Sequence, residues 1–385
     1  MGVREARRED MPQAADLWLR AFRGQQRRAP QALRDYFQLI FFGAPWRDEA
    51  LPSLVCEEGG RLAGFLGVIP RRMRFRGEPI RVAVTTQIMV DPAARNPYIA
   101  MALARRHMAS PQDLLISDGS NQAADRLWRG FGAEVTPLYN FNWFRLLRPA
   151  QYLASLVRSR TSLAALAASL GLACRAADAL LALGPGSLRL PPRADGLTEE
   201  DPTPSLLERG IRELAAERSI APDYEPQALG WLLERAAEKR AHGTLVKRLL
   251  RGPRGATAGW YLFYARPGGV AQVLLASARP AHVRDVLHRL FREARARGAV
   301  AVTGQLDPRH MADFATAGCR FAWPGYSVLA HSRRPELMAA IHRGDAWLTR
   351  LEGEWWARFS DPSWSEAEAG PLEKEVPECA ASQAS

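Results

Sequence analysis

The chain contains the same order of predicted helices and strands twice, and this repeat restricts the folds that it can adopt. Hydrophobic periodicity predicts the order β-α-α-β-β-β-α-β-α-β in the first half. Its strands are expected at residues 3–6, 53–57, 62–75, 80–90, 113–117 and 141–147, and its helices at 11–22, 30–42, 98–108 and 121–131. The second half repeats this order, with helices at 204–217, 226–240, 281–297 and 309–317 and strands at 244–250, 256–265, 270–278, 299–303 and 326–331. Because 385 residues exceed what one hydrophobic core usually organises, we expect two α/β domains.

A short sequence echo accompanies the repeat. Gly60-Arg61-Leu62-Ala63-Gly64 and Gly255-Ala256-Thr257-Ala258-Gly259 fall at the same predicted hairpin of the two halves. Two glycine-bearing turns could resemble each other by chance, but the shared order of elements around them favours duplication.

The segment between the halves differs in composition from both. An Ala/Leu-rich helical stretch gives way to residues rich in glycine and proline, which is typical of a linker. Beyond residue 360 the chain is acidic and poor in apolar residues, which predicts a disordered tail. The predicted division is an N-terminal domain at 1–148, a helical, proline-rich linker at 149–200, a second domain at 201–335, a C-terminal helix at 336–359 and a tail at 360–385.

The composition excludes several classes of function. The net charge is +11 and comes almost entirely from arginine, since only Lys239, Lys247 and Lys374 are lysines. No run of arginines exceeds two residues and aromatic residues are not interleaved with basic ones, so nucleic-acid binding is not favoured. The four cysteines lie far apart, with no C-x-x-C pair and no histidine at ligand spacing. Neither a metal site nor a disulfide framework is predicted.

The chain has no segment typical of export or of membrane spanning. Its N-terminus is charged and lacks an apolar signal core, so a cytoplasmic location is expected. The longest apolar run, at 161–174, is too short to cross a bilayer. Arginines flank this run, so peripheral membrane contact is an alternative to the favoured interpretation, a packing helix between the domains.

Four segments of the first half, at 3–12, 60–68, 88–95 and 121–132, resemble in order four landmarks of the GNAT superfamily of N-acyltransferases. The second half resembles this family in its order of elements only. The resemblance implies two GNAT-like mixed-sheet domains in tandem, joined by a helical linker. This arrangement is similar to tandem enzymes such as mycothiol synthase, in which one copy can lose the cofactor.

The resemblance implies transfer of an acyl group from acetyl-coenzyme A, or another acyl-coenzyme A, to an amine. The amine attacks the thioester directly, so the protein must place the thioester, polarise its carbonyl and manage two protons. In the family, the strand matching 82–90 separates from the one matching 113–117, and the pantetheine arm lies between them. By this resemblance, backbone groups of Ile88, Met89 and Val90 hold the arm.

The turn that follows would bind the pyrophosphate, because free amides and the positive end of a helix favour an anion. The family has Arg or Gln, two residues, Gly, one residue, then Gly or Ala. This chain has Arg95-Asn96-Pro97-Tyr98-Ile99-Ala100. Tyr98 takes the position of the first glycine, and Pro97 removes one amide donor. In the alternative interpretation, Arg95 and Asn96 only cap the helix that begins at Pro97.

The remaining candidate residues follow the fifth strand. Asn121 matches a position that often contacts the cofactor in the family, but it is also a suitable N-cap for the next helix. Trp128 replaces the tyrosine that often protonates the leaving thiolate, and an indole cannot act as that acid. Asp118 is the nearest carboxylate to the expected cleft and the candidate catalytic base, although Asp118-Gly119-Ser120 also reads as an ordinary turn. Water could serve as the base instead.

In the second half, the strand at 270–278 runs almost directly into a helix and leaves no phosphate loop, so no coenzyme A binding is expected there. The working hypothesis is an acyl-coenzyme A-dependent N-acyltransferase acting on a small-molecule or peptide amine, with the second half shaping the acceptor site. Two alternatives stay open: a non-catalytic GNAT-like scaffold in envelope or polysaccharide assembly, and an acyltransferase that takes its acyl group from an acyl carrier protein docked on the basic surface.

Overall fold

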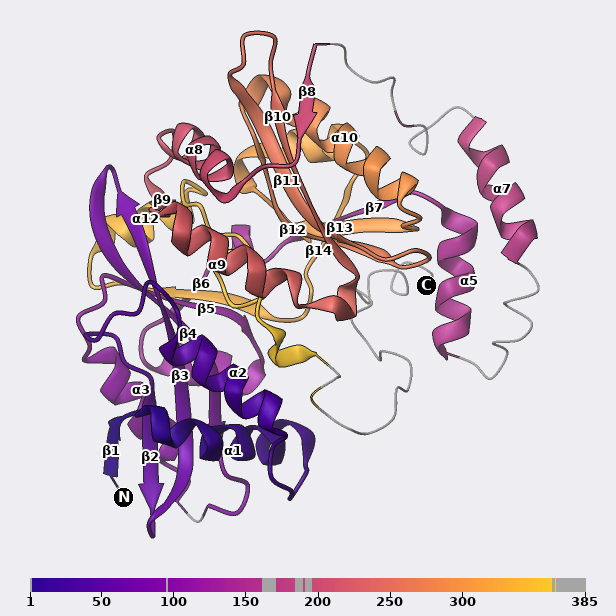
Figure 1. The fold of residues 1–385 in the computed structure, drawn as a ribbon. Coiled ribbons are helices and arrows are strands. Elements are labelled where there is room, and N and C mark those ends of the chain that lie inside the picture. The colour runs from indigo at the N-terminus through magenta and orange to yellow at the C-terminus, as the bar shows by residue number, and fades with distance from the viewer. Residues whose placement is uncertain are drawn as a thin grey trace.

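The computed structural model describes residues 2–94, 96–160, 171–183, 190, 196–361 and 364. These residues form two mixed β-sheets with helices packed on both faces of each, which confirms the predicted α/β class (Figure 1). Among the described residues, no helix is both long enough and apolar enough to cross a membrane.

The first sheet has the strand order β1-β2-β3-β4-β5-β15-β6, and β9 pairs with the far end of β3. Its strands are β1 Gly2–Glu5, β2 Leu54–Glu58, β3 Arg61–Phe75, β4 Glu78–Val90, β5 Leu114–Ser120, β6 Glu134–Val135, β9 Ile220–Pro222 and β15 Ser327–His331. Neighbouring strands run antiparallel except β4 and β5, which are parallel.

The second sheet has the order β8-β10-β11-β12-β13-β7-β14. Its strands are β7 Asn142–Leu146, β8 Thr198–Glu200, β10 Thr244–Arg251, β11 Thr257–Ala265, β12 Val270–Ala278, β13 Ala301–Gln305 and β14 Arg320–Ala322. Here too one pair is parallel, β12 with β13, and it occupies the place that β4 and β5 occupy in the first sheet. The two sheets therefore have the same topology, as the repeat predicts.

The helices divide between the faces of the sheets according to the alternation of side chains along each strand. In the first sheet, Val82 and Val84 face α1 and α2, whereas Ala83 faces α3 and α4. In the second sheet, α8 and α9 cover one face and α10 and α11 the other. Their bounds are α1 Met11–Arg23, α2 Gln31–Phe42, α3 Ile99–Met108, α4 Gln122–Gly130, α8 Pro204–Ala215, α9 Pro226–Ala237, α10 Val283–Ala296 and α11 Met311–Thr316.

The two units exchange their last strands, which corrects the sequence-based assignment of two elements. The strand predicted at 141–147 was expected to complete the first unit, but as β7 it lies between β13 and β14 of the second sheet. The strand predicted at 326–331 was expected in the second unit, but as β15 it lies between β5 and β6 of the first sheet. The alternation of apolar residues indicates that a segment forms a strand. It does not indicate which sheet that strand joins.

The segment predicted as a linker contributes structure of its own. It contains α5 Pro149–Arg160 and α7 Gly171–Leu183, which pack against each other, and it ends in β8 at the edge of the second sheet. The prediction of a helix from 161 to 170 and the glycine- and proline-rich run at 184–189 and 191–195 lie outside the described residues.

The C-terminal helix is shorter than predicted. Helix α12 covers Pro335–His342 and ends before Gly344, whose φ of 73° is left-handed and favours glycine. Residues 343–357 then form turns and irregular backbone, where a helix was expected up to 359. This C-terminal segment, residues 346–361, packs between the α1–α2 face of the first sheet and the α8–α9 face of the second in one continuous core. The predicted disordered tail falls almost wholly outside the described residues.

Candidate active site

The parallel strands β4 and β5 separate partway along their length and open a cleft. They pair from Val82 with Leu114 to Thr85 with Ser117, and beyond this point β4 continues to Val90 without contacting β5 through its backbone. The cleft between the separated ends has a volume of about 640 Å³. It runs from the end of α1, at Trp18 and Phe22, to the starts of α3 and α4. Such a cleft is deep enough to hold an extended ligand arm.

A β-bulge in β4 marks the point where the strands separate. Phe65 of β3 pairs with Met89 and Gly67 pairs with Thr86, so two residues of β4, Gln87 and Ile88, lie opposite one residue of β3. Gln87 has a φ of 50°, which is uncommon for a residue other than glycine. Ile88 and Val90 line the cleft, whereas the Met89 side chain points into the core. The sequence-predicted trio therefore lies at the cleft, with one of its side chains turned away.

The turn before α3 differs from the predicted phosphate turn in its hydrogen bonding. The Tyr98 backbone N–H donates to the Asn96 Oδ1 at 2.9 Å, but α3 begins at Ile99 with Tyr98 as its N-cap and has no side-chain cap, so this bond closes a turn before the helix and not the cap at Pro97 that the alternative interpretation expected. The Tyr98 side chain is 63% exposed and leaves the cleft unobstructed. Ala100 lines the cleft and Ile99 is buried beneath it. Arg95 lies outside the described residues. The first-turn amides of α3 have no partner within the helix, and Ala100 of this turn lines the cleft.

Asn121 and Trp128 both line the cleft from α4. The Asn121 Oδ1 accepts hydrogen bonds from the backbone N–H groups of Ala123 at 3.1 Å and Ala124 at 3.0 Å, so this side chain caps the helix. Trp128 is buried and its ring meets that of His107 edge to face. Burial lowers the pKa of His107 to about 4, so this histidine is a neutral core residue.

Asp118 does not line the cleft. Its carboxyl group is buried against the C-terminal segment, and a Cβ added at Gly353 would stand 2.0 Å from the Asp118 Oδ2. Burial raises its pKa, while the backbone amides of Glu354 and Trp355 oppose that rise. The predicted base therefore contacts the protein backbone and not the space where a substrate would lie.

The carboxylate that does line the cleft is Glu354, which the sequence interpretation missed. It reaches the first sheet from the C-terminal segment, and the Thr86 hydroxyl of β4 donates a hydrogen bond to its Oε2. Burial, and then the charge of Asp118, raise the pKa of Glu354 well above its usual range. A carboxyl group of this kind takes up and releases a proton closer to neutral pH.

A directed chain of hydrogen bonds fixes the Glu354 carboxyl group. The Trp18 indole can only donate, and it donates to the Gln87 Oε1 at 2.8 Å. The Gln87 amide nitrogen must then face the Thr86 Oγ1, at 3.2 Å, and the Thr86 hydroxyl proton is left to point at Glu354. The bulge at Gln87 is what brings these groups into line. Gln87 also donates to the Glu354 carboxyl group, so Thr86 and Gln87 together hold this group as an acceptor.

Arg71 of β3 anchors the segment that carries Glu354. Its buried guanidinium group donates to the carbonyl oxygens of Leu351 at 3.2 Å, Glu352 at 3.0 Å and Gly353 at 3.4 Å. The same group lies over the rings of Trp46 and Trp356, at 4.7 and 5.4 Å from their centroids. A buried charge with these partners holds the backbone before Glu354 in one conformation.

The neighbouring Glu352 supports this anchor. Its carboxyl group accepts from the Tyr224 hydroxyl at 2.7 Å and from the Thr349 backbone amide at 3.1 Å. Burial raises its pKa, against hydrogen bonds from Thr349 and Tyr224 and the charge of Arg71. Nothing local in the sequence around residues 349–356 pointed to this role, because Arg71 and Thr86, its hydrogen-bond partners on the first sheet, lie 281 and 268 positions away.

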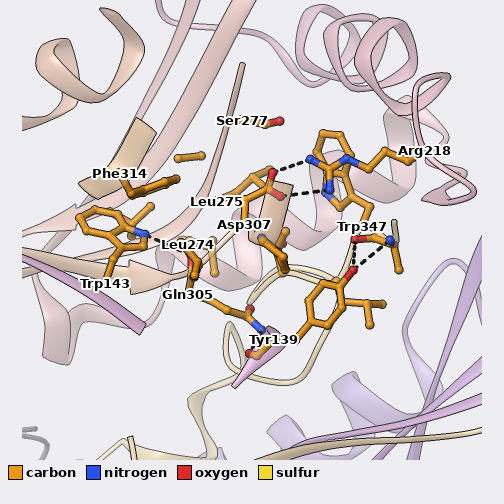
Figure 2. Close-up of a pocket in the computed structure, with 17 residues that line it drawn as sticks. Tyr139, Trp143, Arg218, Leu274, Leu275, Ser277, Gln305, Asp307, Phe314 and Trp347 are labelled. Atoms are coloured by element: carbon orange, nitrogen blue, oxygen red, sulfur yellow. Dashed lines mark hydrogen bonds and ion pairs between the residues drawn. The ribbon is translucent and has the colours of Figure 1, made fainter. Parts of the chain in front are cut away.

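The matching place in the second sheet is filled with protein (Figure 2). Strands β12 and β13 pair as far as Val273 with Gly304, and the space beyond holds a cavity of about 30 Å³, room for about one water molecule. Tyr139 and Trp347 are among the residues that line it, and the Arg218 guanidinium group binds Asp307 at its edge. Burial opposes ionisation of Asp307, but the charge and hydrogen bonds of Arg218 hold its pKa below the usual value.

Asp307 and His310 both follow β13 in the second unit, but only Asp307 lines this cavity. Asp307 is engaged by Arg218 and by the Arg309 backbone amide at 3.2 Å. No group of three or more His, Cys, Asp or Glu side chains in the described part of the chain is arranged to hold a metal ion.

Comparison with known proteins agrees with this geometry. Residues 2–113 match a family model described as an acetyltransferase (GNAT) domain. No curated protein matches the chain by sequence. The matched residues run from β1 to the residue before β5, so they include β4, which forms one wall of the cleft, and all of α3.

Several solved structures are similar over most of the chain. A probable N-acyltransferase from Enterococcus faecalis is 12% identical, with a TM-score of 0.55, covering 89% of this chain and 73% of that one. A GCN5-related N-acetyltransferase from Anabaena variabilis is 12% identical, with a TM-score of 0.56, covering 87% and 73%. Eis1 from Mycobacterium abscessus is 16% identical, with a TM-score of 0.50, covering 89% and 76%. At these identities the likeness establishes the fold.

Proposed function

Since the chain carries a GNAT acetyltransferase domain at residues 2–113, we propose that it transfers an acyl group from acyl-coenzyme A to an amine within the cleft between β4 and β5. The observation that carries this proposal is the open cleft with a single carboxylate, Glu354, held at its wall by a directed chain of hydrogen bonds. The domain match and the fold both support an acyl-coenzyme A-dependent N-acyltransferase.

The donor would lie along the separated part of β4. Its pantetheine arm would pair with backbone groups at Ile88, Met89 and Val90, which have no strand partner on the β5 side. Its phosphates would meet the first-turn amides of α3, at Ile99 and Ala100. The exposed ring of Tyr98 leaves this approach free, although Pro97 has no N–H and the Tyr98 N–H already donates to Asn96, so fewer amides can reach a diphosphate.

The reaction needs one base and one well-placed thioester. The amine nitrogen forms a bond to the thioester carbon, the carbon–sulfur bond breaks, and the amine proton passes to the Glu354 carboxylate. The thiolate takes its proton from solvent in the open cleft, since Trp128 stands where a phenol would supply it. Asp118 positions Glu354 through the backbone of the C-terminal segment and does not touch the substrate.

The acceptor would enter from the α1 side. Trp18, Phe22 and Phe359 line this end of the cleft, with Arg23 over the Trp18 ring at 5.1 Å. The acceptor is therefore proposed to be a small molecule or peptide whose amine lies beside apolar or aromatic groups. The C-terminal segment completes this side, because its Glu354 and Phe359 line the cleft.

Titration calorimetry with acetyl-coenzyme A tests the donor. We expect saturable binding and a raised melting temperature. No heat and no thermal shift at millimolar ligand would reject acyl-coenzyme A. Thioester consumption in the presence of a panel of aromatic and aliphatic amines then tests the transfer. Glu354→Gln should keep donor binding and lose transfer.

A second candidate function is binding without transfer, as in a scaffold protein. Trp128 favours it, because the residue at the position of the usual acid cannot donate a proton at neutral pH. A protein that binds coenzyme A but consumes no thioester with any amine of the panel would support this candidate against the first.

A further inference from the structure

The outer face of α3 carries an apolar and basic stripe beside the mouth of the cleft. Tyr98, Met101 and Arg105 are spaced so that they share one face of the helix. Tyr98 is 63% exposed and Met101 50%, and both are among the large hydrophobic side chains that stand out of the surface. Ala100, which lies between Tyr98 and Met101 in the chain, lines the cleft. The stripe therefore begins where a ligand arm would leave the cleft.

The charge around this stripe is positive and is not neutralised by the protein. Helix α3 contains no acidic residue, and Arg105 and Arg106 are both exposed. Arg126 is exposed on α4, which packs beside α3. Within the described residues, no ion pair involves these three arginines, whereas Arg129 of α4 pairs with Asp125 at 3.7 Å. Three unpaired guanidinium groups next to exposed apolar side chains are typical of a surface that binds an acidic partner.

The start of α3 also offers few donors to a diphosphate. Pro97 has no N–H, and the N–H of Tyr98 is already engaged by Asn96. A pantetheine arm attached to a protein carries one phosphodiester in place of the diphosphate and nucleotide of coenzyme A. Such a donor needs fewer amides here, and the remainder of its affinity must come from the protein surface that carries the arm.

We propose that the α3 face, defined by Tyr98, Met101, Arg105, Arg106 and Arg126, docks an acidic acyl carrier protein that inserts its phosphopantetheine arm into the cleft. This inference rests on the proposed function, because it uses the same cleft for the same thioester. The apolar side chains would contact the carrier near the point of attachment, and the arginines would pair with carboxylates around it.

Binding measurements separate this inference from the proposed function. The probe is an acyl carrier protein whose arm carries an acetyl group through an amide in place of the thioester, and the comparison ligand is coenzyme A. We expect the carrier to bind with an affinity that falls as salt concentration rises. The double variant R105E/R106E should weaken carrier binding about tenfold or more, while coenzyme A binding changes about twofold or less. M101E should do the same through loss of apolar contact.

The matched control is Arg254→Glu, which reverses an exposed arginine at the β10–β11 turn, remote from α3 in the chain. It should leave carrier binding unchanged, and melting temperatures of all variants should match the wild type. If coenzyme A binds and the carrier does not, the docking inference is overturned and the proposed function stands. If R105E/R106E weakens coenzyme A as strongly as the carrier, the face serves the nucleotide and the inference also fails. If neither ligand binds, the proposed function itself is rejected.

Discussion

The two sheets share a topology but differ in what lies between their parallel strands. In the first, the cleft between β4 and β5 measures about 640 Å³, and in the second the space between β12 and β13 measures about 30 Å³. The backbone separates in the same way in both. Side chains from elsewhere in the chain differ between the two: Tyr139 and Trp347 line the small second space, whereas Trp18, Phe22 and Phe359 line the much larger first cleft. A repeated fold thus keeps its scaffold while one copy loses its site.

One segment accounts for much of this contrast. Trp347, near the beginning of the C-terminal segment, lines the small cavity of the second sheet. Glu354, seven positions later, lines the cleft of the first sheet. The C-terminal segment therefore contributes an aromatic side chain to the small cavity of the second sheet and a carboxyl group to the cleft of the first. Its position between the two helical faces explains how it can do both.

The largest expected effect is the loss of stability caused by Trp347→Ala, which removes a buried side chain that lines the cavity of the second sheet. The Trp347 ring is 3% exposed and stacks on Trp260 at 5.8 Å, so its removal should lower the free energy of unfolding by about 3–5 kcal/mol. Trp347→Phe is the control, because the Trp347 indole nitrogen has no hydrogen-bond partner to lose. Denaturant unfolding measures both. If the Ala variant is as stable as the wild type, the packing of Trp347 does not stabilise the second unit.

The next largest expected effect is a loss of acyl-transfer rate in the Glu354→Gln variant of the first cleft. We expect the rate of acyl transfer to fall about 10²-fold or more, because an amide cannot accept the proton. In the wild type, burial raises the pKa of Glu354, so the rate should rise with pH through that pKa. The variant should lose this limb of the pH profile while donor binding persists.

The same variant should become more stable than the wild type at higher pH. A carboxyl group whose pKa is raised in the folded state stabilises the fold below its unfolded pKa, and this contribution disappears as pH rises through the folded pKa. Glutamine carries no such dependence. Identical pH–stability curves for the two proteins would contradict the burial of this carboxyl group.

A smaller effect is expected at the contact between Gly353 and Asp118. A methyl group at residue 353 would stand 2.0 Å from the Asp118 Oδ2 and 2.8 Å from its Cγ. Gly353→Ala should therefore cost about 1–3 kcal/mol of stability and displace Glu354. Asp118→Ala in the same chain removes those atoms and should restore part of the loss. Additive effects in this double-mutant cycle would show that the two residues do not meet.

The smallest effect is expected from Tyr98→Ala. Because the ring is 63% exposed and does not line the cleft, affinity for coenzyme A should change about twofold or less. Calorimetry measures this directly. A gain in affinity of tenfold or more would mean that the Tyr98 ring obstructs binding of the phosphates. The first cleft would then be less accessible to coenzyme A than its lining indicates.

Local patterns predicted the elements well and the long-range contacts poorly. Alternating apolar residues and glycine-bearing turns placed β3 and β4 within about two residues of their bounds, because these signals lie within each strand. The partner sheet of β7 and β15 was not predictable, since both are short strands of similar character. Glu354 was missed for a related reason: Thr86 lies 268 positions away, and the hydrogen-bond chain through Gln87 exists only after folding.

The exchange of β7 and β15 has a consequence for how the protein is made. The first sheet cannot be completed until Ser327–His331 has left the ribosome, although its other central strands are synthesised more than 200 residues earlier. During that interval β5 and β6 have an empty place between them, with backbone groups open to other chains. Translation must therefore reach β15, beyond most of the second unit, before the first sheet is complete, which sets this protein apart from multidomain chains that fold one domain at a time.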